Sequence, residues 1–280
     1  MTDDLNQQSA FDKFDIADRV AIVTGGAGLL GRSHAMTLAS AGAAVVIADI
    51  RKQAADETAD DVRAATGRGC LPLAVDVSDA GSVGTMVKQT LERCGRIDIL
   101  VNNAALDPKF DREHADKHPT RFEQFPLDAW QQAMDVNITG MFLCAQAVAP
   151  TMVEAGQGVM VNVSSTYGIV GPDQRLYQRE GQPQQIKPVT YSVAKAAALG
   201  LTRYLATYFA GKGIRVNALT PGGVIADHDD EFVRRYSAKT VLGRMAEKEE
   251  ISSALLFLVS DASSYMTGAN LVVDGGWTAW

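Results

Sequence analysis

Short apolar runs alternate along the chain with longer segments in which apolar residues recur at helical spacing. The runs occupy residues 20–23, 44–49, 71–75, 97–101, 159–163, 214–219 and 269–273. Continuous runs of this length, bounded by turn residues, are typical of parallel strands buried on both faces. Helical segments lie between them at 31–41, 53–65, 79–94, 128–154, 190–211 and 247–260. The pattern predicts an α/β fold: a Rossmann-type, doubly wound parallel sheet of about seven strands with helices on both faces.

Two segments interrupt this alternation. Residues 105–127 are rich in charge and proline, and residues 167–189 are rich in glycine, proline and polar side chains. Each follows the end of a predicted strand, where sheets of this kind bind their ligands. Long loops in compact domains are usually functional or disordered. We expect substrate-binding elements; the alternative is that both are surface loops without a role.

The composition narrows the function classes. The 280 residues are 46% hydrophobic and carry a formal net charge of −7. Such an acidic chain has no global attraction to nucleic acid or to an anionic membrane, and no apolar run is long enough to span a bilayer. The N-terminal residues 1–16 are polar and do not resemble a secretory signal. We expect one catalytic domain over residues 1–280, with 1–16 as a flexible or peripheral extension.

The three cysteines indicate the compartment. Cys70, Cys94 and Cys144 are widely separated and odd in number. Their spacing matches neither a disulfide framework nor a set of metal ligands. We therefore expect reduced thiols, a cytoplasmic location and no metal.

A glycine motif follows the first predicted strand. The segment 24–31 reads TGGAGLLG and contains G-x-G-x-x-G as Gly26, Gly28 and Gly31. Glycines between a strand and a helix let the backbone approach a pyrophosphate, and the start of the helix favours the anion. Asp49 closes the second strand, where a carboxylate accepts hydrogen bonds from the ribose of NAD and repels the extra phosphate of NADP. The cofactor we expect is NAD, although Asp49 alone also fits a turn, and Arg51 would soften the discrimination.

Polar residues also follow the third and fourth predicted strands. Asp76 and Val77 stand after the third, and residues 102–104, Asn-Asn-Ala, stand after the fourth. Because parallel strands end at the same edge of the sheet, these positions are placed to border the adenine and its ribose. Taken alone, each indicates only a turn.

Tyr191 and Lys195 are one helical turn apart and share a face of the predicted helix. A tyrosine phenol has an ordinary pKa near 10. A nearby ammonium lowers that pKa because it stabilises the phenolate. The phenol then exchanges a proton with a substrate oxygen near the working pH. By itself, such a pair is common and decides little.

The motifs together resemble the short-chain dehydrogenase/reductase family over about residues 17–276. The similarity is carried, in order, by the glycine motif 24–31, Asn102-Asn103-Ala104, Asn137, Ser164-Ser165, Tyr191 with Lys195, Pro221-Gly222 and residues 273–276. It implies an NAD-dependent oxidoreductase that moves a hydride between the nicotinamide and an alcohol or ketone carbon.

The resemblance also implies roles for individual residues. Tyr191 would be the general acid/base, and Lys195 would lower its pKa and bind the nicotinamide ribose. Ser165, with Ser164 as the adjacent candidate, would hydrogen-bond the substrate oxygen. Asn137 would hold a water that links Lys195 to solvent. The implied cofactor-binding residues are Gly25, Gly28, Leu30, Gly31, Asp49, Ile50, Asp76, Val77, Asn103, Ala104, Tyr191, Lys195, Pro221, Gly222 and Val224.

The chain departs from the family's pattern at three places. The glycine motif has the T-G-x-x-G-x-x-G spacing that is commoner in sugar-nucleotide epimerases and dehydratases, but too few residues follow Lys195 for their larger second domain. Ala105 stands where the family usually has glycine. The interval between Ser165 and Tyr191 is longer than usual and contains Arg175. These departures leave the substrate open.

Polar side chains in the two irregular segments favour a small-molecule substrate such as a sugar, sugar acid or other polyhydroxylated compound. In this interpretation Arg175 contacts an anionic group, and Ser165 and Tyr191 bind the reacting oxygen. A solvated loop surface and an apolar secondary alcohol remain alternatives. Two further classes also stay open: a redox-neutral epimerase or dehydratase with tightly held NAD, and a nucleotide-binding regulator.

The resemblance further implies a homotetramer. The chain ends in residues 277–280, Trp-Thr-Ala-Trp, directly after the last predicted strand. Two exposed tryptophans would be unusual on a protein surface. We therefore expect Trp277 and Trp280 to lie at a subunit contact or to cover a neighbouring active site.

Overall fold

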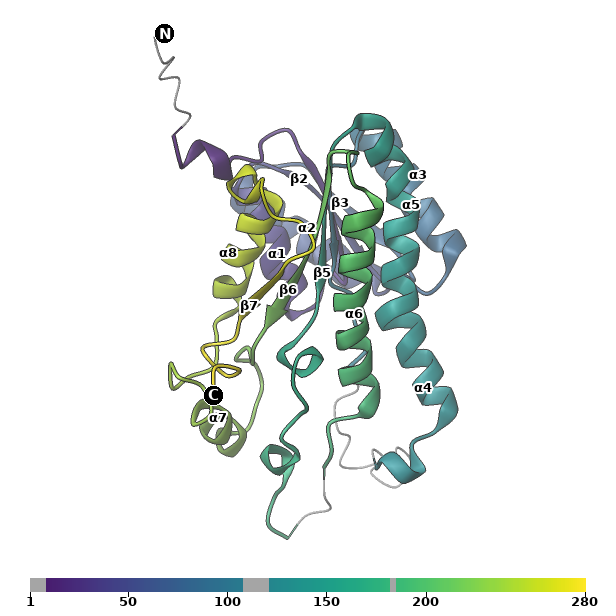
Figure 1. Ribbon diagram of the computed structural model, residues 1–280. Helices are drawn as coiled ribbons and strands as arrows, with labels where there is room; N and C mark the ends of the chain where they lie inside the picture. The colour runs from purple at the N-terminus through teal and green to yellow at the C-terminus, as the bar shows by residue number, and fades with distance from the viewer. Residues whose placement is uncertain (1–8, 108–120, 182–184) are drawn as a thin grey trace.

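The computed structural model describes residues 9–107, 121–181 and 185–280. Within these residues, seven parallel strands form one sheet in the order β3-β2-β1-β4-β5-β6-β7 (Figure 1). The strands are β1 (Val20–Thr24), β2 (Ala44–Asp49), β3 (Cys70–Ala74), β4 (Ile99–Asn102), β5 (Gly158–Val163), β6 (Ile214–Pro221) and β7 (Asn270–Val273). The predicted doubly wound α/β sheet is confirmed.

The centre of the sheet explains the continuous apolar runs. Every residue of β1 is buried, and β1 pairs with β2 on one side and β4 on the other. The chain adds β2 and β3 outward from β1 and then returns to the opposite side of β1 with β4. Such a reversal in strand order places a ligand crevice beyond the carboxyl ends of the strands next to it.

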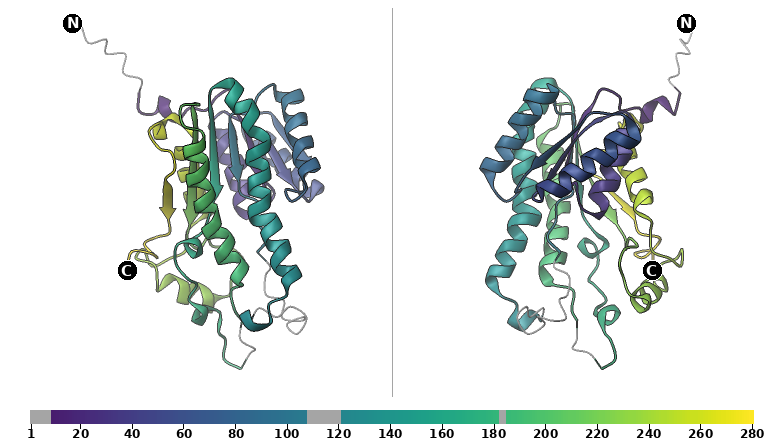
Figure 2. Two further views of the ribbon diagram at one scale, coloured as in Figure 1. Left: turned by 45° about the vertical axis from the view of Figure 1, so that its right-hand side comes forward. Right: turned by 180° about the vertical axis from the view of Figure 1, so that it is seen from behind.

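Helices cover both faces of the sheet (Figure 2). Helices α1 (Leu29–Ser40), α2 (Lys52–Thr66) and α8 (Lys248–Val259) pack against one face, where Leu38, Val62 and Leu255 join the core. Helices α3 (Ala80–Cys94), α5 (Gly140–Ala155) and α6 (Val189–Tyr208) supply the core of the other face. This arrangement buries both sides of each central strand, which parallel sheets require.

The prediction of one continuous α-helix over 128–154 is wrong in one respect. The structure has α4 (Leu127–Met134), a five-residue π-helix (Asp135–Thr139) and α5 in succession. The π-helix holds the buried side chain of Asn137, and wider turns of this kind are frequent at functional sites. One widened turn cannot be recognised from the spacing of apolar residues, because the helical spacing continues on both sides of it.

The apolar segment Leu127–Ala155 is long enough by composition to cross a membrane. Its buried residues include Cys144, Val148 and Met152, which pack in the core on this face of the sheet. The segment is therefore a core helix of the fold.

Two irregular regions extend beyond the carboxyl ends of the strands (Figure 1). The described residues of the first region, 164–181 and 185–188, contain two short 3-10 helices, Thr166–Gly168 and Gln174–Tyr177. Opposite them lies α7 (Asp230–Ser237), which the sequence pattern did not predict because it is short and mostly polar. Of the other predicted loop, 105–127, residues 108–120 lie outside the described part of the chain.

The end of the predicted N-terminal extension contacts the body of the protein. Ile16 is fully buried in the core beside α1, and its amide donates to the Ala41 carbonyl at 3.3 Å. The ring of Phe14 lies 6.4 Å from that of Phe257 in α8. Residues 12–16 thus form a short strap along this side of the molecule.

Candidate active site

The glycine turn after β1 brings three backbone segments into close contact. Gly25 adopts a left-handed φ of +61°, and a Cβ there would lie 2.8 Å from the Cα of Ala104. A Cβ on Gly31 would lie only 2.1 Å from the Gly25 carbonyl oxygen. Gly28 precedes α1, and no side chain caps the first amides of the helix. The result is a compact turn with exposed helix-start amides, which suits an anionic group such as a pyrophosphate.

Asp49 fastens the end of β2 to this turn. Its carboxylate is buried and accepts hydrogen bonds from the amides of Ala27 and Arg51, both at 3.0 Å. The guanidinium of Arg51 also donates to Asp49, at 3.3 Å, and its side chain is largely exposed. Arg32 donates to the Ala27 carbonyl at 3.1 Å. The glycine turn, the uncapped helix start and this carboxylate fit a nicotinamide dinucleotide, with Asp49 at the adenosine ribose.

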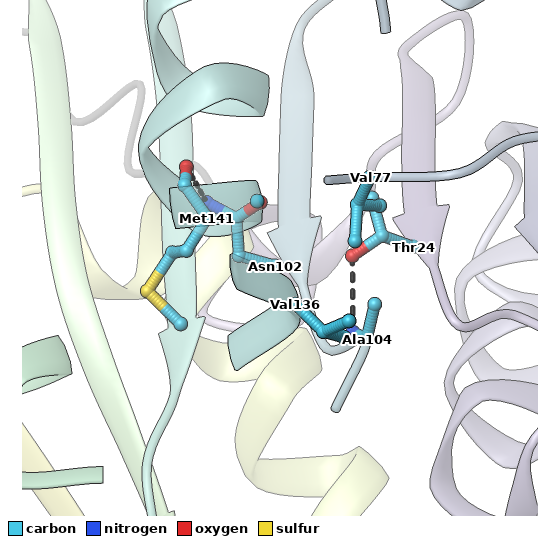
Figure 3. Close-up of a pocket in the computed structure, with 7 residues that line it drawn as sticks. Thr24, Val77, Asn102, Ala104, Val136 and Met141 are labelled. Carbon is cyan, nitrogen blue, oxygen red and sulfur yellow. Dashed lines mark hydrogen bonds between the residues drawn. The ribbon is translucent and has the colours of Figure 1, made fainter. Parts of the chain in front are cut away.

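A narrow hollow lies between the ends of β1 and β4, and Figure 3 shows the side chains that line it. The Thr24 hydroxyl accepts hydrogen bonds from the amides of Asn103 and Ala104 at 3.0 and 3.1 Å. The Asn103 side-chain amide donates to the Thr24 and Gly25 carbonyls. Val77 lines the same hollow. The residues predicted after the first, third and fourth strands therefore meet, and Asn103 braces the glycine turn.

Tyr191, Ser165 and Lys195 converge at the ends of β5 and α6. Ser165 follows β5, and its hydroxyl is hydrogen-bonded to the phenol of Tyr191 in the first turn of α6. Tyr191 is half-buried. Burial, and then the negative charge of Asp107, raise the pKa of Tyr191 to about 12. The phenol is therefore protonated at neutral pH unless further positive charge is brought near it.

Lys195 provides a buried ammonium beneath the tyrosine. It is 5% exposed, and its Nζ donates to the Val163 carbonyl at 2.8 Å. The same nitrogen lies 5.8 Å from the centroid of the Tyr191 ring. Burial lowers the pKa of Lys195 to about 8, although Asp107 opposes this effect. Ser164, the adjacent candidate for binding the substrate oxygen, has another partner. Its hydroxyl donates to the Lys195 carbonyl and fixes α6 to the end of β5.

Asn137 in the π-helix is bound to the loop after β4. Its Oδ1 accepts from the Leu106 amide at 2.6 Å, and its Nδ2 donates to the Leu106 carbonyl at 3.0 Å. Both ends of the side-chain amide are therefore engaged by the backbone. In this structure Asn137 positions the residues next to Leu106; the water that the resemblance implies stays a prediction.

A second lysine lies above the catalytic ring. The Nζ of Lys187 is 3.9 Å from the centroid of the Tyr191 ring and donates to both carboxylate oxygens of Asp107, at 2.8 and 2.6 Å. Lys187 stands two residues before the start of α6, whereas Asp107 ends the described part of the loop after β4. The two residues join opposite sides of the site.

Aromatic side chains enclose the remaining side of the site. We call this group the aromatic wall: Tyr167, Tyr177, Phe232, Tyr236 and Trp277. Trp277 stacks on Tyr236 with ring centroids 4.2 Å apart, and Tyr167 meets Tyr191 edge to face at 6.4 Å. The Tyr236 hydroxyl accepts from the Gly223 amide at 2.6 Å, which ties the wall to the loop after β6 that holds the predicted cofactor-binding residues Gly222 and Val224. The wall gives the site a largely apolar side.

Comparisons with known proteins agree with this geometry. A family model described as enoyl-(acyl carrier protein) reductase matches residues 26–278. The cis-4-hydroxycyclohexanecarboxylate dehydrogenase of Sinomonas cyclohexanicum is 37% identical over 268 residues, which cover 94% of this chain and 98% of that protein. The trans-4-hydroxycyclohexanecarboxylate dehydrogenase of the same organism is 38% identical over 269 residues and 94% of each chain. A crystal structure of a short-chain type dehydrogenase/reductase from Mycobacterium marinum has a TM-score of 0.85 at 33% identity, covering 97% of this chain and 100% of that one. The chain is a short-chain dehydrogenase/reductase.

Membership of the short-chain dehydrogenase/reductase family confirms three predictions: the family, the fold, and an oxidoreductase that acts on CH–OH groups. Dehydrogenases of this family use a nicotinamide cofactor, so the cofactor class is confirmed as well. The roles of the individual site residues rest on the geometry described above and stay predictions.

The structure also places the remaining predicted residues of this dehydrogenase, of which Trp277 belongs to the aromatic wall. The guanidinium of Arg175 is exposed and paired with Asp173 at 2.8 Å. Trp277 is 8% exposed within its own chain, so it needs no second subunit to bury it, whereas Trp280 is 79% exposed. Four predicted cofactor-binding regions can also be placed. Ile50 is exposed, and Asp76 accepts from the Ser78 hydroxyl.

Leu30 packs against the core, and Gly222 and Val224 lie in the loop after β6.

Sequence reasoning missed Lys187 and most of the aromatic wall. Lys187 stands in a segment of mixed polarity, and nothing in its local sequence places it over Tyr191. Phe232 and Tyr236 belong to the unpredicted helix α7. The sequence offered one indication that Lys187 belongs to the site: it stands four positions before Tyr191.

Proposed function

We propose that this short-chain dehydrogenase/reductase is an NAD-dependent dehydrogenase that oxidises a secondary alcohol on a ring-shaped substrate to the ketone, and catalyses the reverse reduction. The observation that carries the proposal is the catalytic group itself. A tyrosine phenol is hydrogen-bonded to Ser165, lies above the buried ammonium of Lys195 and faces the aromatic wall.

The chemistry follows from these groups. When bound, a nicotinamide cofactor would supply the acceptor for the hydride of the carbinol carbon. Tyr191 accepts the proton of the substrate hydroxyl during oxidation and returns it during reduction. Ser165 holds the substrate oxygen beside the phenol by hydrogen bonding. Lys195 supplies positive charge that favours the phenolate, which offsets the effect of burial on the pKa of Tyr191.

Asp49 supports NAD rather than NADP. The carboxylate is buried at the end of β2, where a phosphate on the adenosine ribose would meet its negative charge. The nearest cationic side chain, Arg51, is bound to Asp49 and is therefore partly neutralised. A free arginine at this position would instead favour NADP.

The proposed substrate class rests on the aromatic wall and on the relatives. Flat aromatic side chains suit the faces of a six-membered ring, and the two Sinomonas cyclohexanicum relatives are named for hydroxycyclohexanecarboxylates. A second candidate is a sugar or sugar acid. It is favoured by the polar groups beside the wall, since Lys239 pairs with Asp173 and lies 5.4 Å from the Trp277 ring. Both candidates combine a ring with a secondary alcohol.

We also propose that the enzyme works in the cytoplasm as a homotetramer. Its three cysteines are unpaired, as expected in a reducing compartment. Tyr204 and Tyr208 on α6 and Phe142 on α5 expose large apolar surfaces. Helix faces of this kind are suited to subunit contacts.

The test is reduction of the cofactor, followed by absorbance at 340 nm. Purified enzyme is given NAD or NADP with cyclohexanol, cis- and trans-4-hydroxycyclohexanecarboxylate, sugars, sugar acids and linear secondary alcohols. We expect NADH with cyclic alcohols and a loss of turnover in Tyr191→Phe, with cofactor binding retained. Turnover confined to linear alcohols would overturn the substrate class, and full activity of Tyr191→Phe would overturn the catalytic assignment.

A further inference from the structure

We propose that Lys187 is a specificity-determining residue that binds a carboxylate on the substrate, in the place that Asp107 holds in the free enzyme. The inference rests on the proposed function, because it names an anionic subclass of the cyclic alcohols. In this proposal the ion pair between Lys187 and Asp107 has a role in substrate binding as well as in joining two loops.

The position of Lys187 points toward the substrate. Its Nζ lies 3.9 Å above the centre of the Tyr191 ring, whose hydroxyl is the proposed acid/base. Among the described side chains, Lys187 and Lys195 are the cations whose contact with the Tyr191 ring the structure records. Lys195 is directed to the Val163 carbonyl at the end of β5. Lys187 is therefore the cation available to a group bound above the ring.

The backbone beside each member of the ion pair is held in place. The backbone of Lys187 exchanges hydrogen bonds with the side chain of Gln174, at 2.8 and 3.3 Å. Asp107 directly follows Leu106, whose amide and carbonyl are bound by Asn137. A lysine whose backbone is already fixed loses less freedom when it binds an anion, which favours affinity.

Exposure shows which partner is replaceable. The Lys187 side chain is 15% exposed, whereas that of Asp107 is 41% exposed. A half-exposed ion pair is weak, because solvent competes with it. The lysine, by contrast, needs an anionic partner, since an unpaired charge at that depth is costly. A substrate carboxylate that enters above the ring can take over the position of the Asp107 carboxylate while Asp107 turns to water.

The arrangement also allows one small substrate to reach both groups. Lys187 lies over the ring of the tyrosine whose hydroxyl is the proposed acid/base, so the carboxylate and the alcohol of one molecule would be bound close together. A ring with its acid and its alcohol on opposite sides fits both contacts. Substrates without the acid keep only the contact with Tyr191 and Ser165.

Binding is tested with two probes of equal shape, cyclohexanecarboxylate and cyclohexanecarboxamide, titrated by calorimetry into the enzyme with NADH. Hydrogen bonds to a charged group are stronger than neutral ones, so we expect the carboxylate to bind roughly tenfold to a hundredfold more tightly. Lys187→Gln should remove this difference. Asp107→Asn should enlarge it, because the variant removes the competing carboxylate and keeps the side-chain volume. Equal binding of the two probes to the wild type, or an undiminished preference in Lys187→Gln, would overturn the proposal.

Lys212→Gln is the matched control. Lys212 makes the same kind of contact elsewhere, with its Nζ 4.4 Å from the Tyr208 ring. The variant should keep the wild-type preference. An effect of Lys187 on the Tyr191 phenol alone would change both probes alike and leave their ratio unchanged, which would contradict a carboxylate site.

The proposed function is tested separately by turnover. Oxidation of cyclohexanol without any preference for the carboxylate probe would sustain the dehydrogenase and overturn the anion site. A carboxylate preference that depends on Lys187, without oxidation of any cyclic alcohol, would sustain the anion site and overturn the proposed reaction.

Discussion

Replacing Gly31 by alanine should disable the cofactor turn of this dehydrogenase. The added Cβ would lie 2.1 Å from the Gly25 carbonyl oxygen and 2.8 Å from the Cα of Gly26. Both neighbours are backbone, so the strain cannot be relieved by turning a flexible side chain. Restoring an ordinary contact requires α1 and the turn to separate by about 1 Å, and overpacking of this kind typically costs about 1–3 kcal/mol.

The loss should appear in two measurements. Urea unfolding should show Gly31→Ala less stable by about 2 kcal/mol. NADH fluorescence titration should show at least about tenfold weaker binding, the equivalent of 1.4 kcal/mol, because the turn and the start of α1 no longer meet the pyrophosphate together. Wild-type stability together with wild-type NADH affinity would refute the assigned role of this glycine.

Gly84→Ala is the matched control. Gly84 is exposed within α3, and apart from its own helix backbone no atom lies within 4 Å of the position a Cβ would take. Alanine is favoured over glycine in a helix by roughly 0.5–1 kcal/mol. The variant should be slightly more stable than the wild type and bind NADH unchanged. If Gly84→Ala were destabilised as well, the loss of stability in Gly31→Ala could not be attributed to the lack of space around Gly31.

Three further predictions concern pH, cofactor choice and assembly. Burial lowers the pKa of His34 to about 4, so the unfolded state takes up a proton first as pH falls. The stability that the neutral ring contributes is thus present above about pH 6.5 and lost toward pH 4. Urea unfolding should show that this residue makes the protein less stable at pH 4.5 than at pH 7.5 by about 2–3 kcal/mol. His34→Gln should remove this difference, and a variant as acid-sensitive as the wild type would disprove the reasoning. Asp49→Ala should narrow the preference for NAD over NADP in kcat/KM, whereas an unchanged ratio would move the ribose contact elsewhere. Deleting the exposed Trp280 should lower the mass measured by light scattering if this residue lies at a subunit contact, and an unchanged mass would exclude that contact.

The strands and the shared helix face of Tyr191 and Lys195 were predictable because their causes are local. A buried parallel strand needs a continuous apolar run, and each strand of the sheet lies within a few residues of such a run. Tyr191 and Lys195 are related by one turn of a single helix, so their shared face follows from spacing alone. The glycine turn is likewise recognisable locally, since its glycines stand together within the segment 24–31, although Asn103 and Ala104 from a distant loop also contact it.

The remaining features depend on contacts between distant segments. Lys187 meets Asp107 across 80 positions of chain, and neither residue carries a local pattern that indicates the other. The π-helix around Asn137 is stabilised by hydrogen bonds to Leu106 from another loop. Arg175 looked available for an anionic substrate, but Asp173 two residues earlier binds its guanidinium. In each case the partner, and not the residue type, determines what the side chain does.

Hydride transfer itself can be followed with a cyclic alcohol that carries deuterium at its carbinol carbon. The enzyme is incubated with this substrate and NAD, and the reduced cofactor is analysed by mass spectrometry. A dehydrogenase that uses Tyr191 as described will give NADH carrying one deuterium, and Tyr191→Phe will give none. Conversion of the substrate without labelled NADH would contradict the proposed reaction and indicate a redox-neutral one.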